Sequence, residues 1–151
     1  MLAGRVLIVM AALLGAVLVG ASGCQDNSST ATQFTQPLNE FIANANTISQ
    51  ADTSNSSSVQ SAIDEALPKM KSDLESMEQA QAQLTDQAAE VAGTINSLAQ
   101  QAVNQLQEIQ KAIQKKNTQQ AQQAVSNFTE SAKQIQEQIN VWNNEVASVE
   151  D

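Results

Sequence analysis

Few side chains in this 151-residue sequence could take part in covalent chemistry. Cys24 is the only cysteine, and there is no histidine to act as a general base for its thiol or for a serine. A serine–lysine pair is the remaining arrangement. The lysines, however, fall at positions that we expect to be exposed on helices: Lys69, Lys71, Lys111, Lys115, Lys116 and Lys133. We therefore expect no catalytic residues and a protein that is not an enzyme.

Carboxylates form two clusters that could bind a divalent cation. The first is Asp64 with Glu65, and the second is Asp73 with Glu75 and Glu78. Neither cluster has the glycine and Asx spacing of an EF-hand loop, and a di-iron bundle would need Glu-x-x-His pairs. We interpret both clusters as solvated helix faces, and we expect no metal site and no cofactor.

The residues ahead of Cys24 have the three parts of a secretory signal. Residues 1–5 form a short cationic start, residues 6–19 are almost wholly apolar, and residues 20–23 are all small. Small residues let an extended backbone enter a protease site at the membrane surface. We therefore predict cleavage between Gly23 and Cys24, which makes Cys24 the mature N-terminal residue.

The stretch Ala21-Ser22-Gly23-Cys24 resembles the lipobox of bacterial lipoproteins, although Ala21 stands where that family usually has Leu. The resemblance covers about the first 24 residues. It implies that residues 1–23 are a lipoprotein signal peptide and that the Cys24 thiol carries a thioether-linked diacylglycerol. Two or three acyl chains, at about 0.8 kcal/mol per buried CH₂, hold a protein durably at a membrane.

Lipid on Cys24 would place the protein at the extracytoplasmic face of the cell membrane. Gln25 follows in place of Asp, which by resemblance to other lipoproteins indicates the outer membrane in a cell with two membranes. Two alternatives stay open. Residues 6–23 give 18 mostly apolar positions, close to the lower limit for a membrane span, so one is an uncleaved signal anchor. The other is ordinary cleavage that leaves a free thiol.

The composition after residue 23 favours helices and limits the classes of partner. Glutamine occurs 22 times in the chain, alanine is abundant and aromatic residues make up only 3%. Six lysines stand against sixteen acidic residues, a formal charge of −10. Such a surface lacks the clustered cations that phosphate contacts need, and anionic headgroups repel it. We expect an all-α protein that does not bind nucleic acid.

Apolar residues recur at spacings of four and three along most of the remaining chain, as on a helix with one apolar face. Residues 24–33 lack this pattern, and we interpret them as the lipidated cysteine with a disordered tether. Residues 34–151 are expected to form one helical bundle domain. The stripes are Phe34, Leu38, Phe41, Ala45 and Ile48; Ile63, Leu67, Met70, Leu74, Met77, Gln81, Leu84, Ala88, Val91, Ile95, Leu98 and Ala102; and Ala121, Val125, Phe128, Ala132, Ile135, Ile139, Trp142, Val146 and Val149.

Two prolines and one threonine mark the places where these helices are expected to begin or break. Pro37 suits a first turn, so the first helix is expected from about residue 36. Pro68 is expected to kink or restart the second helix, because its ring removes an N–H and restricts the preceding residue. Thr85 could cap a new helix, but no Gly or Pro lies there, so we expect the helix to continue.

Short connections predict how the helices are arranged. Residues 51–58 form a Ser-rich loop with Ser58 as the expected N-cap, and residues 116–118 form a turn with Thr118 as the expected N-cap. Short loops make consecutive helices antiparallel. We predict an elongated antiparallel up-and-down helical bundle with coiled-coil-like seams, of three long helices, or four if the chain breaks at Thr85. Oligomerisation through such seams is compatible with the pattern.

Two functions fit these features. The first is a membrane-anchored lipoprotein that acts as a non-enzymatic interaction or structural protein of the cell envelope and docks a protein partner side by side or in a groove. The second is a carrier for a small apolar ligand held between alanine-rich seams. Trp142 is expected to pack in the core, with a binding anchor as the alternative. The alanines of those seams are Ala88, Ala92, Ala99, Ala102, Ala124 and Ala132.

Overall fold

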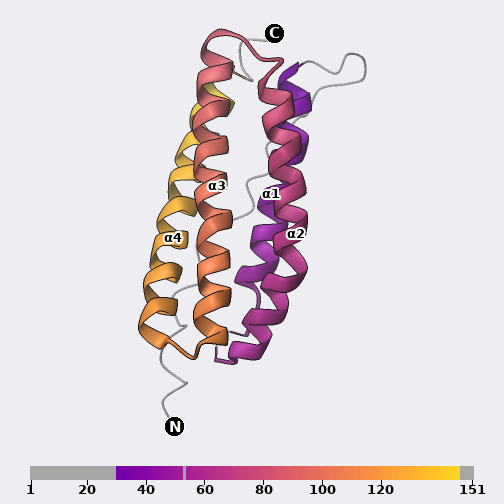
Figure 1. Cartoon of the computed structure of the whole chain (residues 1–151). Helices are drawn as coiled ribbons and strands as arrows, with labels where there is room; N and C mark the ends of the chain where they lie inside the picture. The colour runs from indigo at the N-terminus through magenta and orange to yellow at the C-terminus, as the bar shows by residue number, and fades with distance from the viewer. Residues whose placement is uncertain (1–29, 53, 147–151) are drawn as a thin grey trace.

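The computed structural model describes residues 30–52 and 54–146, and the expected signal peptide, with Gly23 and Cys24, lies outside this part. All regular secondary structure in the described residues is helical. Four α-helices run alternately up and down, and a short π-helix follows the last (Figure 1). The elements are α1 (Thr30–Ser49), α2 (Ser56–Gln81), α3 (Asp86–Gln114), α4 (Thr118–Val141) and the π-helix η1 (Trp142–Val146). The predicted all-α antiparallel bundle is confirmed, in its four-helix form.

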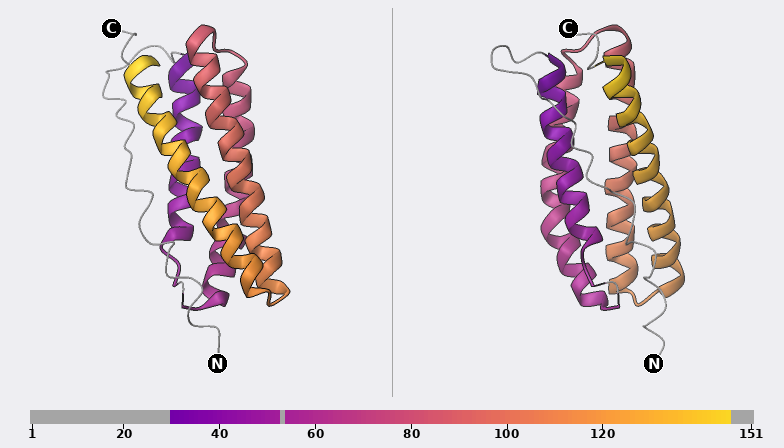
Figure 2. Two further views of the ribbon diagram at one scale, coloured as in Figure 1. Left: turned by 90° about the vertical axis from the view of Figure 1, so that its left-hand side faces the viewer. Right: turned by 180° about the vertical axis from the view of Figure 1, so that it is seen from behind.

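The four helices pair into two hairpins, α1 with α2 and α3 with α4. Backbone packing is closest within each hairpin, and the hairpins meet chiefly where α2 lies beside α3. Figure 2 shows α4 tilted across α1, so that the C-terminal end of α4 lies near the N-terminal end of α1. The bundle therefore has two seams between its hairpins, one along α2 and α3 and one along α1 and α4.

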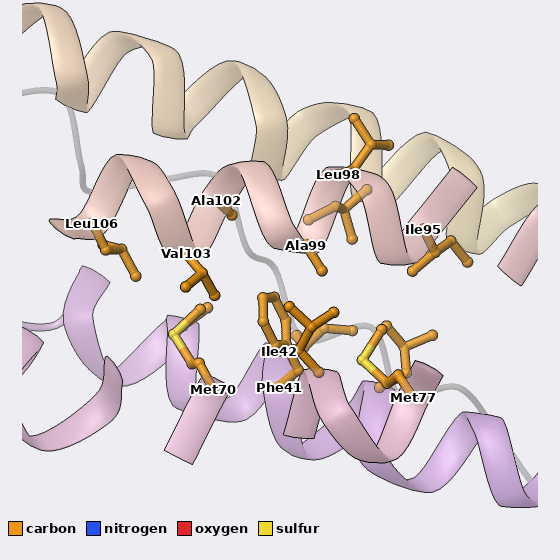
Figure 3. Close-up of a cluster of buried hydrophobic side chains, with 14 of the residues drawn as sticks. Phe41, Ile42, Met70, Met77, Ile95, Leu98, Ala99, Ala102, Val103 and Leu106 are labelled. Carbon is orange, nitrogen blue, oxygen red and sulfur yellow. The ribbon is translucent and has the colours of Figure 1, made fainter. Parts of the chain in front are cut away.

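The apolar core fills the space between the hairpins. In Figure 3, Ile95, Val103 and Leu106 of α3 point toward Met70 and Met77 of α2. Full burial of a side chain of this size stabilises the fold by about 1.5–3 kcal/mol. The apolar stripes are buried nearly throughout, as the spacing predicts, and the half-exposed members of the long stripe are Gln81, Leu84 and Ala88.

Helix α1 begins at Thr30, about two turns before the expected start at residue 36. Residues 30–33, expected to belong to a disordered tether, are helical, and Ala31 is buried. Pro37 thus lies inside the helix and not in its first turn. The early turns hold because Phe34 is fully buried, and because the Thr35 hydroxyl donates to the Ala31 carbonyl oxygen at 2.9 Å.

Helix α2 passes through Pro68 without ending, so the expected restart at this residue is wrong. The residues on either side of it along the stripe, Leu67 and Met70, are both buried. Proline removes one backbone hydrogen bond, and the buried contacts on both sides offset that loss.

The chain turns back after Gln81, so the expected continuous helix through Thr85 is wrong. Thr85 takes the extended conformation of an N-cap, but its side chain accepts no capping hydrogen bond. Asp86, the next residue, has a φ of 51°, in the left-handed region. Because the chain reverses here, the two halves of the long apolar stripe bury each other. This tertiary packing overrides the local preference of the residues for a helix.

Asparagines, rather than the expected Ser58 and Thr118, cap the helices that follow the two other loops. The Asn55 side chain accepts from the Ser57 amide at 3.0 Å, and the Asn117 side chain accepts from the Gln120 amide at 3.1 Å. Asparagine and serine are about equally good N-cap residues. The sequence alone therefore leaves the start of each helix uncertain by one to three residues.

Helix α3 ends in a Schellman motif that has lysine where glycine is usual. The Lys116 N–H donates to the Ile113 carbonyl at 3.0 Å, and the Asn117 N–H donates to the Ala112 carbonyl at 2.9 Å. Lys116 has a φ of 53°. A side chain in this left-handed conformation is strained, because its Cβ crowds the following carbonyl oxygen.

Replacing Lys116 by glycine should therefore stabilise the protein. We expect Lys116→Gly to raise the free energy of unfolding by about 0.5–1 kcal/mol, as measured by urea denaturation followed by circular dichroism. Lys115→Gly is the matched control, because it removes the same charge at a residue with a φ of −82°. It should lower that free energy, and equal effects of the two changes would contradict the explanation.

Candidate functional site: two seams between the hairpins

The seam along α2 and α3 carries a surface groove with polar walls, here called the polar groove. One wall is a stripe on α2 of Lys71, Glu75 and Glu78, and the other is a stripe on α3 of Gln100, Asn104 and Gln107. Leu74 and Val103 lie between the walls and are almost fully buried. Because each wall repeats at intervals of three and four residues, the groove runs along the helix axes and presents hydrogen-bonding groups over about two turns.

A buried asparagine of α3 and a half-buried glutamine of α2 tie these two helices together beside this groove. Asn96 is only 5% exposed, and its amide donates to the Gln81 side-chain oxygen at 2.6 Å. The Gln81 amide in turn donates to the Ala89 carbonyl at 3.4 Å. Gly93 leaves room for this amide, since a Cβ there would lie 2.8 Å from the Gln81 nitrogen. The polar member of the long stripe thus fixes the register of α3 against α2.

The seam along α1 and α4, here called the aromatic seam, contains every aromatic residue of the chain. Phe34 and Phe41 come from α1, Phe128 comes from α4, and Trp142 begins η1. Bulky rings fill this seam because α1 and α4 are farther apart than the helices within each hairpin.

Trp142 is fully buried, which confirms the prediction that it packs in the core and excludes the alternative of an exposed anchor. Its ring centroid lies 4.8 Å from that of Phe34, at a tilt of 42°. Its indole N–H donates to the Thr35 hydroxyl at 3.3 Å, and that hydroxyl donates onward to Ala31. The indole is therefore satisfied in the interior, as a buried tryptophan requires.

A crevice in the aromatic seam is lined only by apolar side chains. Its cavity volume is about 10 Å³, roughly the space that a single water occupies. With α1 and α4 in this position the crevice is too small for a ligand, although its walls would suit one. The lining residues are Phe41, Ile42, Ala45, Ala102, Phe128, Ala132 and Ile135.

Asp73 departs from the expectation that its carboxylate cluster is a solvated face. It is 8% exposed, whereas its neighbours Glu75 and Glu78 are exposed as expected. The Asn44 amide of α1 donates to the Asp73 carboxylate at 2.7 Å and is its hydrogen-bond partner across the first hairpin. Burial raises the pKa of this carboxyl above its usual value, the Asn44 bond opposes the rise, and the nearby Glu40 adds to it.

The other candidate chemical residues lie apart from one another on the surface. All six lysines are exposed; Lys69 pairs with Glu65 at 3.1 Å and Lys111 with Glu108 at 3.0 Å, one helical turn away in each case. No group of acidic residues in the described part is arranged to hold a metal ion. Within the same residues no helix is long and apolar enough to cross a membrane. Gly23 and Cys24 fall outside the described residues.

Comparisons with known proteins returned no match. No family model, no curated protein and no solved structure resembles the chain at a significant level.

The buried Asp73 carboxylate should make stability depend on pH in a specific direction. The folded state holds the proton more tightly than the unfolded chain, so this group's contribution falls as pH rises from the unfolded pKa of about 3.9 through the raised folded value. We expect Asp73→Asn to stabilise the protein at pH 7, with a gain that shrinks toward zero at pH 3. Urea titrations followed by circular dichroism at both pH values measure it.

Glu75→Gln is the matched control, since it removes the same charge from an exposed position on the same helix. A gain for Glu75→Gln as large as that for Asp73→Asn would show that relief of overall repulsion, and not burial, is responsible.

Proposed function

We propose that this protein is a lipid-anchored, extracytoplasmic, non-enzymatic interaction protein of the cell envelope. The anchor is the acylated Cys24, the tether is the short polar segment after it, and the bundle is the part that a partner protein contacts. The observation that carries the interaction role is the polar groove. It is a surface channel with two periodic polar walls and a buried apolar floor, suited to a helix or extended segment lying along it.

The charge of the bundle supports the proposal that the lipid alone attaches the protein to the membrane. The anionic surface gives the bundle no attraction of its own to anionic headgroups, so attachment depends on the lipid. Five residues separate Cys24 from the start of α1, which allows a reach of about 20 Å. Helix α3, with 29 residues, extends about 44 Å, so most of the groove can stand clear of the membrane surface.

Lipidation has a direct test in cells of the native host. We expect the full chain to incorporate a clickable palmitate analogue and to sediment with membranes, and Cys24→Ala to abolish the label, because no other residue of the chain offers a thiol. Ser22→Ala is the control, since it keeps a small residue ahead of the cleavage point and should leave labelling unchanged. Label retained by Cys24→Ala would overturn the proposed anchor.

The partner surface is tested by site-specific photo-crosslinking. A benzophenone side chain at Gln107, in the polar groove, should give a defined adduct in envelope preparations, and one at Gln123, exposed on α4, should not. Glu75→Lys combined with Glu78→Lys reverses the charge of one wall and should reduce the Gln107 adduct several-fold. Equal adducts at both positions, or indifference to the charge reversal, would argue against the groove.

A carrier for a small apolar ligand is the second candidate, and the purely apolar lining of the crevice in the aromatic seam favours it. Such a ligand would have to separate α1 from α4 to enter. Native mass spectrometry of protein purified without detergent should then show a bound species. A bare polypeptide mass, apart from any lipid on Cys24, would remove this candidate.

A further inference from the structure

The connection between α2 and α3 is made of residues that suit a helix. It consists of Ala82, Gln83, Leu84 and Thr85, with neither glycine nor proline among them. Alanine, glutamine and leucine are among the stronger helix formers. The other two loops, in contrast, contain a serine-rich run or a Schellman motif followed by an asparagine cap.

The apolar period also runs through this connection without interruption. Met77, Gln81, Leu84, Ala88 and Val91 keep the alternation of four and three, so in one continuous helix they would lie on a single face. In the closed bundle Leu84 and Ala88 are only half-buried against the core. A continuous helix through this connection, packed against a partner, would bury both side chains more completely.

The reversal itself is strained. Asp86 is held at a φ of 51°, and Thr85 provides no side-chain capping bond for the helix that begins there. Both features disappear if the backbone continues as a helix, because Asp86 then takes an ordinary conformation and the amides of the α3 first turn find carbonyl partners.

The contacts that would have to be given up can be remade with a second copy. Pairs within a hairpin, such as Asn44 with Asp73, are unaffected when the two hairpins separate. Pairs between hairpins join residues on opposite sides of the connection, as Gln81 does with Asn96 and Thr35 with Trp142. A second copy supplies the same residues in the same arrangement, so the energetic difference between the two forms is concentrated at residues 82–86.

We propose that the chain also forms a domain-swapped dimer in which α2 and α3 merge into one helix over residues 56–114. Each α1–α2 hairpin then packs on the α3–α4 hairpin of the other copy, through the same two seams. The merged helices cross near Ala88, midway between Gln81 and Asn96, and the half-exposed Leu84 and Ala88 of both copies become buried at this crossing. Because each chain is strongly anionic, the dimer gains population as ionic strength rises.

The first test asks whether the backbone at Asp86 controls association. The mature chain, residues 24–151 without the apolar signal segment, carries Cys24→Ser so that neither lipid nor a stray thiol intervenes, and is measured by sedimentation equilibrium across concentration and salt. Asp86→Ala should raise the association constant by about tenfold or more, and Asp86→Gly should lower it by a similar factor, because glycine relieves the strain of the closed form.

Lys116→Ala is the matched control, since Lys116 is the other non-glycine residue of the described part with positive φ, and it lies within a hairpin. It should leave the association constant unchanged. A monomer at all concentrations for both the parent chain and Asp86→Ala, or equal responses to Asp86→Ala and Lys116→Ala, would overturn the proposal.

The second test distinguishes a swapped dimer from two closed bundles lying side by side. Gln81→Cys with Asn96→Cys, in the same Cys24→Ser chain, places two thiols where the side chains are hydrogen-bonded. Oxidation of the isolated dimer should link the two chains covalently on a non-reducing gel. Oxidised dimer that runs as a single chain would show that Gln81 still meets Asn96 of its own copy, and would refute the swap.

Discussion

The structure depends on the simultaneous burial of two stretches of one long apolar stripe against each other. Helix α3 packs on α2 along one side and on α4 along another, and eleven of its 29 residues are buried. Helices α2 and α4 pack directly on α3, and α1 is held chiefly by α2. Figure 3 shows side chains of α3 facing Met70 and Met77 of α2. The four aromatic residues all lie in the seam of α1 with α4 and η1, where the helix backbones pack less closely than within each hairpin.

Polar side chains inside the bundle have a different effect from the apolar ones. A stripe of aliphatic residues can slide by a heptad and still be buried, whereas a hydrogen bond such as that from Asn96 to Gln81 is made in only one register. Asn44 with Asp73 does the same for the first hairpin, at the expense of a carboxylate removed from water. These polar pairs lower the stability of the fold somewhat but allow only one alignment of the helices, a role that buried polar groups have in several helical assemblies.

The helical class and nearly all of the core followed from the spacing of the apolar residues, because a period of four and three is visible residue by residue. The antiparallel order followed from the short connections at residues 51–58 and 116–118. The starts of the helices did not, since Asn55 and Asn117 compete with adjacent serines and threonines for the same cap and only the packed chain decides between them. The reversal at residues 82–85 was foreseen only as the alternative to a continuous helix, for a deeper reason. Thr85 is its one local signal, and the reversal is stabilised by contacts between residues on opposite sides of it, such as Gln81 with Asn96.

The buried carboxylate of Asp73 was hidden for the same reason. On its own helix it stands among exposed acids, and only the approach of Asn44 from α1 removes it from solvent. The polar groove likewise arises from two helices, each of which shows an ordinary hydrophilic face when considered by itself. The apolar stripes, by contrast, could be identified within each helix taken singly.

The hydrogen bond from Trp142 to Thr35 spans 107 residues of sequence. Closing so large a loop costs chain entropy that nearest-neighbour helix pairing does not, so this contact should form after both hairpins have assembled. The only tryptophan therefore becomes buried in the last step of folding. Its emission reports the joining of the first and last helices, independently of how much helix has already formed.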